Sequence, residues 1–90
     1  MHTEKWQVEI YLFEDAEGRR TRANAVLHAP GNVRIEFDGF AKRRPTESEV
    51  PEIGEELAVS RALAGLSHRL IEDAVADIAD NIGKPVHLEA

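Results

Sequence analysis

The chain has no cysteine among its 90 residues, so it can form neither disulfide bonds nor cysteine-ligated zinc or iron–sulfur sites. No apolar run approaches the roughly 20 residues that a membrane-spanning helix needs. The first residues, Met-His-Thr-Glu-Lys-Trp, lack the apolar core of a secretion signal. We therefore expect a cytoplasmic protein that does not associate with membranes.

Aromatic residues are scarce, at 6% of the chain, but the remaining composition is that of a folded domain. A content of 42% hydrophobic and 31% charged residues is ordinary for a soluble domain and excludes a disordered tail. The length predicts one domain over residues 1–90. Seventeen acidic residues against eleven Lys plus Arg give a formal net charge of −6, which argues against a general affinity for nucleic acid.

A two-residue alternation of apolar and polar side chains predicts three strands, at about residues 6–14, 20–28 and 33–42. Short polar loops with Gly or Pro-Gly separate them, which favours an antiparallel meander in the order 1-2-3. If Leu27 pairs with Val33, the register places Arg22 opposite Asp38. The alanines of the second segment suggest a middle strand with a large element pressed closely against it. One side of the first strand is apolar, with Trp6, Val8, Ile10 and Leu12.

Residues 52–82 have a helical period and predict one long helix that ends before Gly83, with a possible kink at Gly65. Its apolar side is expected to cover the face of the sheet that carries the apolar side chains of the first strand. The predicted fold class is therefore α+β, a two-layer sandwich of a three-stranded sheet and one C-terminal helix. Residues 43–50 would form the linker and residues 83–90 a tail. The apolar stripe consists of Leu57, Leu63, Ala64, Leu66, Leu70, Ile71, Ala74, Val75, Ile78 and Ile82.

Two segments carry a resemblance to a known family: Arg-Thr-Arg-Ala-Asn-Ala at 20–25 and Val-Pro-Glu-Ile-Gly-Glu-Glu-Leu-Ala-Val-Ser-Arg-Ala-Leu at 50–63. They resemble the bacterial domain of unknown function 1876 family, and the resemblance covers about residues 5–86. It implies a fold like that of double-stranded RNA-binding domains, here without their leading helix. It implies no established biochemical function.

We expect the predicted sheet to carry a protein-interaction surface. One helix can cover only one side of a three-stranded sheet, and the first strand is an edge that invites pairing. We expect a small, acidic, non-catalytic protein that self-associates, with an unidentified protein partner as a further option. The candidate interface lies on the side away from the helix and consists of Tyr11, Phe13, Val26 and Phe40.

Nucleic-acid binding is the alternative hypothesis. Six basic residues would gather at one end of the sheet, where they could contact phosphates. Acidic loop residues such as Glu14 and Glu47 oppose this, and the helix start Pro-Glu-Ile-Gly-Glu-Glu is acidic where double-stranded RNA-binding domains carry lysines. The candidate anion or nucleic-acid patch is Arg19, Arg20, Arg22, Lys42, Arg43 and Arg44.

No motif predicts catalysis, a cofactor or a metal. The four histidines, His2, His28, His68 and His87, are scattered and lack ligand spacing. His68 is expected to contact Glu72 one helical turn on. The acidic residues between 72 and 80 are expected to form a solvated face, with weak binding of a divalent cation as the alternative. We therefore expect no catalytic residue.

Overall fold

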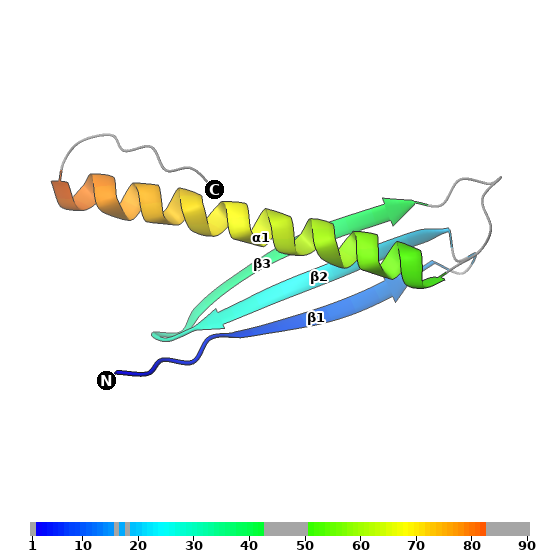
Figure 1. Ribbon diagram of the computed structural model, residues 1–90, viewed down its shortest axis with the longest axis horizontal. Helices are drawn as coiled ribbons and strands as arrows, with labels where there is room; N and C mark the ends of the chain where they lie inside the picture. Colours follow the sequence, from blue (N-terminus) through cyan, green and yellow to red (C-terminus); the bar gives the residue numbers. More distant parts are fainter. Residues whose placement is uncertain (1, 16, 18, 43–50, 83–90) are drawn as a thin grey trace.

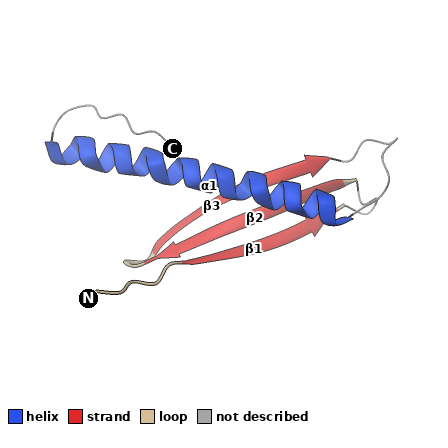
Figure 2. Cartoon of the chain, in the orientation of Figure 1, coloured by secondary structure: helices blue, strands red, loops and turns tan. Residues whose placement is uncertain are grey.

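Three strands and one helix make up the computed structural model, which describes residues 2–15, 17, 19–42 and 51–82. The strands form an antiparallel sheet in the order β1-β2-β3, and the helix crosses one of its faces (Figures 1 and 2). This confirms the predicted α+β class. Each element begins and ends within one residue of its predicted bounds, while 43–50 and 83–90 lie outside the described residues. The elements are β1 (Gln7–Glu14), β2 (Arg20–Ala29), β3 (Val33–Lys42) and α1 (Pro51–Ile82).

The loop between β2 and β3 is shorter than expected. Ala29 pairs with Val33, which leaves only three residues in the loop. Gly31 lies there with a φ of 80°, a left-handed conformation that glycine adopts without a steric penalty. Leu27 therefore pairs with Ile35, and the predicted register was wrong by two residues. A shift of two keeps every side chain on its predicted face of the sheet.

Small residues bring α1 into close contact with β2 and β3. Ala23 and Ala25 of β2 and Ala58 and Ala62 of α1 are fully buried. A Cβ atom at Gly39 of β3 would lie 2.2 Å from the backbone oxygen of Ala58, so the helix backbone rests directly on the strand. The close packing expected above the alanines is present. The buried core is Ala23, Ala25, Leu27, Ala41, Ala58, Ala62 and Leu66.

The helix lies on the predicted face of the sheet, but it is placed over β2 and β3 and leaves β1 uncovered. All eight residues of β1 are exposed, and α1 packs against β2 and β3 (Figure 1). Leu57 and Leu63, which were predicted to belong to the buried stripe, are exposed as well. The physical reason is that the alanine and glycine surfaces permit the closest approach of two backbones, whereas a row of large side chains on β1 would hold a helix away.

The helix runs without interruption through Gly65, where the sequence allowed a kink. A Cβ atom at Gly65 would lie 2.1 Å from the ring of Phe37, so this glycine makes room for an aromatic side chain of β3. At 1.5 Å per residue the 32 residues of α1 span about 48 Å, against about 33 Å for a ten-residue strand. The C-terminal part of α1 consequently extends beyond the sheet (Figure 1).

Candidate interaction surface

The β1 strand is an uncovered sheet edge with an apolar row. It pairs with β2 through all eight residues in a continuous register and contains neither proline nor lysine. In monomeric proteins, such residues, bulges or a covering element usually prevent an edge strand from pairing with a strand of another chain. The apolar side chains on the helix side of β1, together with Trp6 directly before the strand, are between 39% and 53% exposed. They form what we call the apolar row: Trp6, Val8, Ile10 and Leu12.

A groove of about 580 Å³ lies between Leu12 and the N-terminal half of α1. Val59 and Leu63 form its apolar helix side, and Glu55 and Glu56 add two carboxylates. Sequence reasoning missed this groove because it placed the helix over the whole face of the sheet, β1 included. The contrast between large residues on β1 and alanines on β2 was the available signal, since it shows which strand permits close helix packing.

The opposite edge of the sheet, on β3, is protected in two ways. The guanidinium of Arg61 on α1 donates a hydrogen bond to the backbone oxygen of Phe40 at 2.6 Å. The strand also carries four charged residues, Arg34, Glu36, Asp38 and Lys42, whereas β1 carries only Glu9 and Glu14. Charged side chains and a covering helix are the usual means of preventing edge pairing. Of the two edges, β1 is therefore the one open to another strand.

The predicted interface residues share the outer side of the sheet, away from α1. Tyr11, Phe13 and Phe40 are exposed there. Val26 is only 3% exposed, so its inclusion in an accessible surface was wrong. It lies in the middle strand with Glu9 directly opposite on one side and Glu36 on the other, which leaves its short side chain covered.

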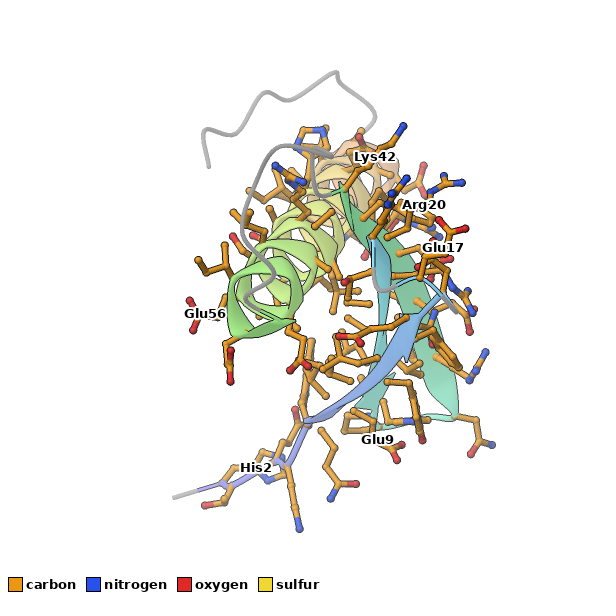
Figure 3. All side chains as sticks on the ribbon, turned by 90° about the vertical axis from the view of Figure 1, so that its right-hand side faces the viewer. His2, Glu9, Glu17, Arg20, Lys42 and Glu56 are labelled. Carbon is orange, nitrogen blue, oxygen red and sulfur yellow. The ribbon has the colours of Figure 1, made fainter. Side chains whose placement is uncertain are left out.

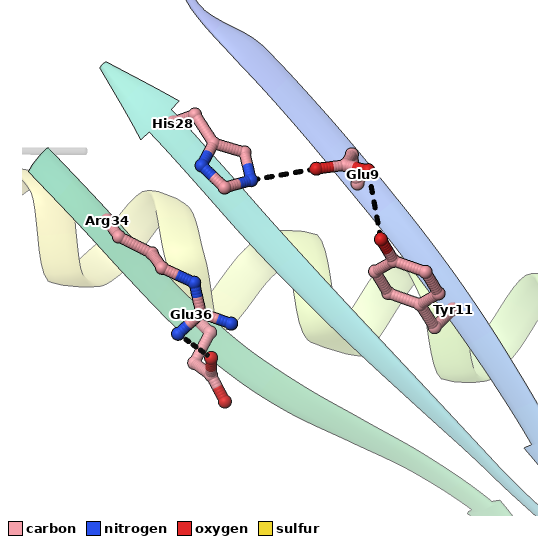
Figure 4. Close-up of polar contacts among 5 residues, drawn as sticks. All are labelled: Glu9, Tyr11, His28, Arg34 and Glu36. Carbon is pink, nitrogen blue, oxygen red and sulfur yellow. Dashed lines mark hydrogen bonds and ion pairs between the residues drawn. The ribbon is translucent and has the colours of Figure 1, made fainter. Parts of the chain in front are cut away.

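A polar cluster on this outer side fixes two side chains of β1 (Figure 4). The hydroxyl of Tyr11 donates to Glu9 at 2.9 Å, and Nε2 of His28 lies 2.8 Å from the other oxygen of that carboxylate. The Tyr11 hydrogen bond, followed by that of His28, lowers the pKa of Glu9. The same bond raises the pKa of Tyr11, because ionising the hydroxyl would break it. Glu9 is therefore held as an anion on the exposed edge strand.

Of the six basic residues predicted to form a patch, Arg20 and Lys42 lie at the end of the sheet that Figure 3 views, and Arg43 and Arg44 lie outside the described residues. Arg19 lies 3.8 Å from Glu17, so its charge is partly compensated. Arg20 lies directly opposite Lys42, and among the described residues no ion pair involves either of them. Like charges opposite each other across two strands are unfavourable unless an anion lies nearby.

Arg22 belongs to a separate polar contact. It pairs with Phe40 and not with Asp38 as predicted, yet its guanidinium reaches Asp38 diagonally at 3.2 Å. The same guanidinium lies 4.3 Å from the ring centre of Phe13. Asn24 donates to Asp38 at 2.7 Å, and this bond, together with that of Arg22, lowers the pKa of Asp38. Arg22 is thus already engaged by an acid and an aromatic ring.

Metal ligation and membrane insertion find no support within the described part of the chain. No group of three or more His, Asp or Glu side chains there could hold a metal ion. His68 lies 3.0 Å from Glu72 on the exposed helix face, which is the contact expected from their spacing. His87 is outside the described residues. In the described part of the chain, no helix is long and apolar enough to cross a bilayer.

The fold and the exposed β1 edge define a small α+β protein in which one long helix leaves part of a three-stranded sheet uncovered. The chain belongs to the Rv2632c-like family, whose model matches residues 4–87. It is 35% identical over 80 residues to the uncharacterized protein Rv2632c of Mycobacterium tuberculosis, covering 89% of this chain and 83% of that protein. It is 36% identical over 83 residues to the uncharacterized protein Mb1767 of Mycobacterium bovis, covering 92% and 85%.

The crystal structure of Rv2632c has the same architecture. It superposes with a TM-score of 0.81 at 30% identity, covering 94% of this chain and 98% of that one. The expectation of a bacterial family without an assigned activity is consistent with these relatives. The likeness to double-stranded RNA-binding domains stays a prediction.

Proposed function

We propose that this protein is a non-catalytic, cytoplasmic interaction module that self-associates through β1. The observation that carries the proposal is the apolar row, which lies on an edge strand that α1 leaves uncovered. Burying apolar surface is worth roughly 25 cal/mol per Å². A sheet edge adds specificity, because its backbone groups bind only another extended strand.

Static light scattering of two charge variants tests the proposal. Leu12→Asp places a carboxylate in the groove and is expected to reduce the mass at high micromolar concentration to that of one chain. Phe40→Asp is the matched control, because Phe40 is more exposed than Leu12, at 55% against 42%, but lies on β3, and it should leave the mass of the parent unchanged. An unchanged mass for Leu12→Asp, or one chain for the parent itself, would contradict the proposal.

Nucleic-acid binding is the second candidate, and the opposed pair of Arg20 and Lys42 favours it. Exposed Phe13 and Phe40 lie on the same side of the sheet and offer rings on which bases stack. The double variant Arg20→Glu with Lys42→Glu should abolish salt-dependent retention of single-stranded and duplex RNA or DNA. No retention of any of these by the parent at low salt would exclude this candidate.

A further inference from the structure

The proposed self-association rests on β1, and the pattern of that strand also specifies how two copies meet. We propose that β1 pairs antiparallel with β1 of a second copy about a two-fold axis at Ile10. The two three-stranded sheets become one six-stranded sheet. The partner's Trp6 then enters the groove beside Leu12.

The register follows from which side chains would face each other. Directly opposite residues of an antiparallel pair lie on the same face, so the axis must pass through one residue of β1. An axis at Glu9 would place two carboxylates opposite each other, which is unfavourable. An axis at Tyr11 would place Val8 opposite the partner's Glu14 and Glu9 opposite the partner's Phe13, and so set an apolar side chain against a carboxylate on both faces of the sheet.

An axis at Ile10 avoids the opposed carboxylates, and its single apolar-against-charge pair is Trp6, which precedes β1, at the level of the partner's Glu14. On the helix side, Val8 lies opposite the partner's Leu12, and Ile10 lies opposite its own copy. On the outer side, Glu9 lies opposite the partner's Tyr11, a phenol of the kind that already donates to this carboxylate within the chain. Gln7 lies opposite the partner's Phe13. The strand is complementary to itself in this register, and each contact away from the axis occurs twice, as an isologous interface requires.

The same register places the partner's Trp6 near the groove. The partner's Val8 adjoins Leu12, and the partner's Trp6, two residues earlier on the same face, reaches the level of Glu14. The groove of about 580 Å³ lies next to these positions, between Leu12 and the helix residues Val59 and Leu63. Trp6 is the only tryptophan of the chain and is 53% exposed in the monomer. Tryptophan in an apolar pocket is a frequent anchor of protein interfaces.

The position of α1 permits this arrangement. A two-fold axis perpendicular to the sheet places both helices on the same side. Because each α1 lies over β2 and β3, the paired β1 strands remain open between the helices. The apolar rows of both copies then form the floor of that space, and the groove beside each Leu12 receives one partner tryptophan. Because both β1 edges are then paired, assembly stops at two copies.

Engineered disulfides test the register, since the chain has no cysteine of its own. Ile10→Cys should cross-link to itself under mild oxidation, because opposite residues have Cα atoms about 4.5–5.5 Å apart and a disulfide spans about 4.4–6.8 Å. Val8→Cys alone should not cross-link, whereas a mixture of Val8→Cys and Leu12→Cys should. A short bismaleimide provides a second measurement that does not require disulfide geometry. Glu36→Cys on β3 is the matched control and should form no cross-link, because Glu36 lies away from the proposed interface.

The outcomes separate this inference from the proposed function. Suppose that the parent is a dimer by light scattering. If Val8→Cys then cross-links to itself, or if Ile10→Cys cross-links neither by oxidation nor with the bismaleimide, the proposed β1 register is wrong, whereas the proposed self-association is retained. If the parent is monomeric at all concentrations, both fail. A dimer dissociated by Phe40→Asp would assign the interface to the outer side instead.

Two lysine variants provide an independent test of the same axis. Ile10→Lys places a charge opposite its own copy and should raise the dissociation constant at least about tenfold. Tyr11→Lys places the charge opposite the partner's Glu9 and should change the constant by less than about threefold. The reverse order would indicate an axis at Tyr11 and overturn the proposal. Thermal melting of each variant checks that the monomer fold is retained.

Discussion

At the scale of single residues, Gly39 determines how closely α1 approaches the sheet. A side chain there would meet the backbone of Ala58 and Ala62 at 2.2–2.3 Å, and backbone atoms of a packed helix cannot give way cheaply. We expect Gly39→Ala to lower the free energy of unfolding by about 2 kcal/mol or more, measured by urea denaturation.

Gly54 provides the matched control for that variant. It lies in α1, and an added Cβ would approach only the side chain of Thr21, at 3.1 Å. Alanine also has the higher helix propensity. Gly54→Ala should therefore change the free energy of unfolding by less than about 1 kcal/mol. Equal losses for the two variants would show that α1 does not rest on β3 through Gly39.

The hydrogen bond from Asn24 to Asp38 makes a pH-dependent contribution to stability. It lowers the pKa of Asp38 from its usual value of 3.8 in the folded state. Such a contribution is complete above the unfolded pKa and is lost as the pH falls through the folded one. Asn24→Ala should be less stable than the parent by about 1 kcal/mol at pH 7, and the difference should shrink below pH 3.8. A difference that is constant down to pH 2 would contradict this reading of the pKa.

At the scale of elements, the strands could be predicted from alternation alone, but the position of the helix could not. The periodicity of α1 identifies large apolar residues such as Leu57 and Leu63, which favours burying them. Packing instead selects Ala58 and Ala62, because contact between two backbones requires small side chains on both surfaces. The length of the loop before β3 could not be predicted either. Whether Pro30 belongs to a three-residue or a five-residue loop depends on local φ values.

The C-terminal part of α1 should be less stable than the part that contacts the sheet. Leu66 is buried and Leu70 partly buried against the core, whereas no described residue after 70 is buried. Amides at 72–80 should therefore exchange with deuterium at least about tenfold faster than those at 58–66. Uniform protection along α1 would mean that another surface covers the overhanging part.

At the scale of the whole molecule, the sequence predicted that β1 is an edge suited to pairing and that Tyr11 and Phe13 lie on its exposed outer side. It did not predict the groove, because the groove exists only where α1 leaves β1 uncovered. The net charge of −6 is unevenly distributed over the molecule. The basic residues Arg20 and Lys42 lie together at one end of the sheet, while carboxylates such as Glu55 and Glu56 line the groove.

Trp6 reports on assembly by its fluorescence, because it is the single tryptophan of the chain. If the partner's groove receives it, the emission maximum should be blue-shifted at high micromolar concentration and should move to the red on dilution. The Leu12→Asp variant should show the red-shifted maximum at every concentration. An emission maximum that stays constant while the mass changes would place Trp6 outside the interface.

The central claim is that the uncovered β1 is the surface through which two copies of this chain associate. Sedimentation equilibrium of the unmodified chain from low to high micromolar concentration tests it most directly. The account predicts a reversible transition from 10.0 kDa to twice that mass, with no larger species, because pairing consumes the only open edge of the described sheet. A single species of 10.0 kDa throughout, or a series of ever larger species, would contradict it.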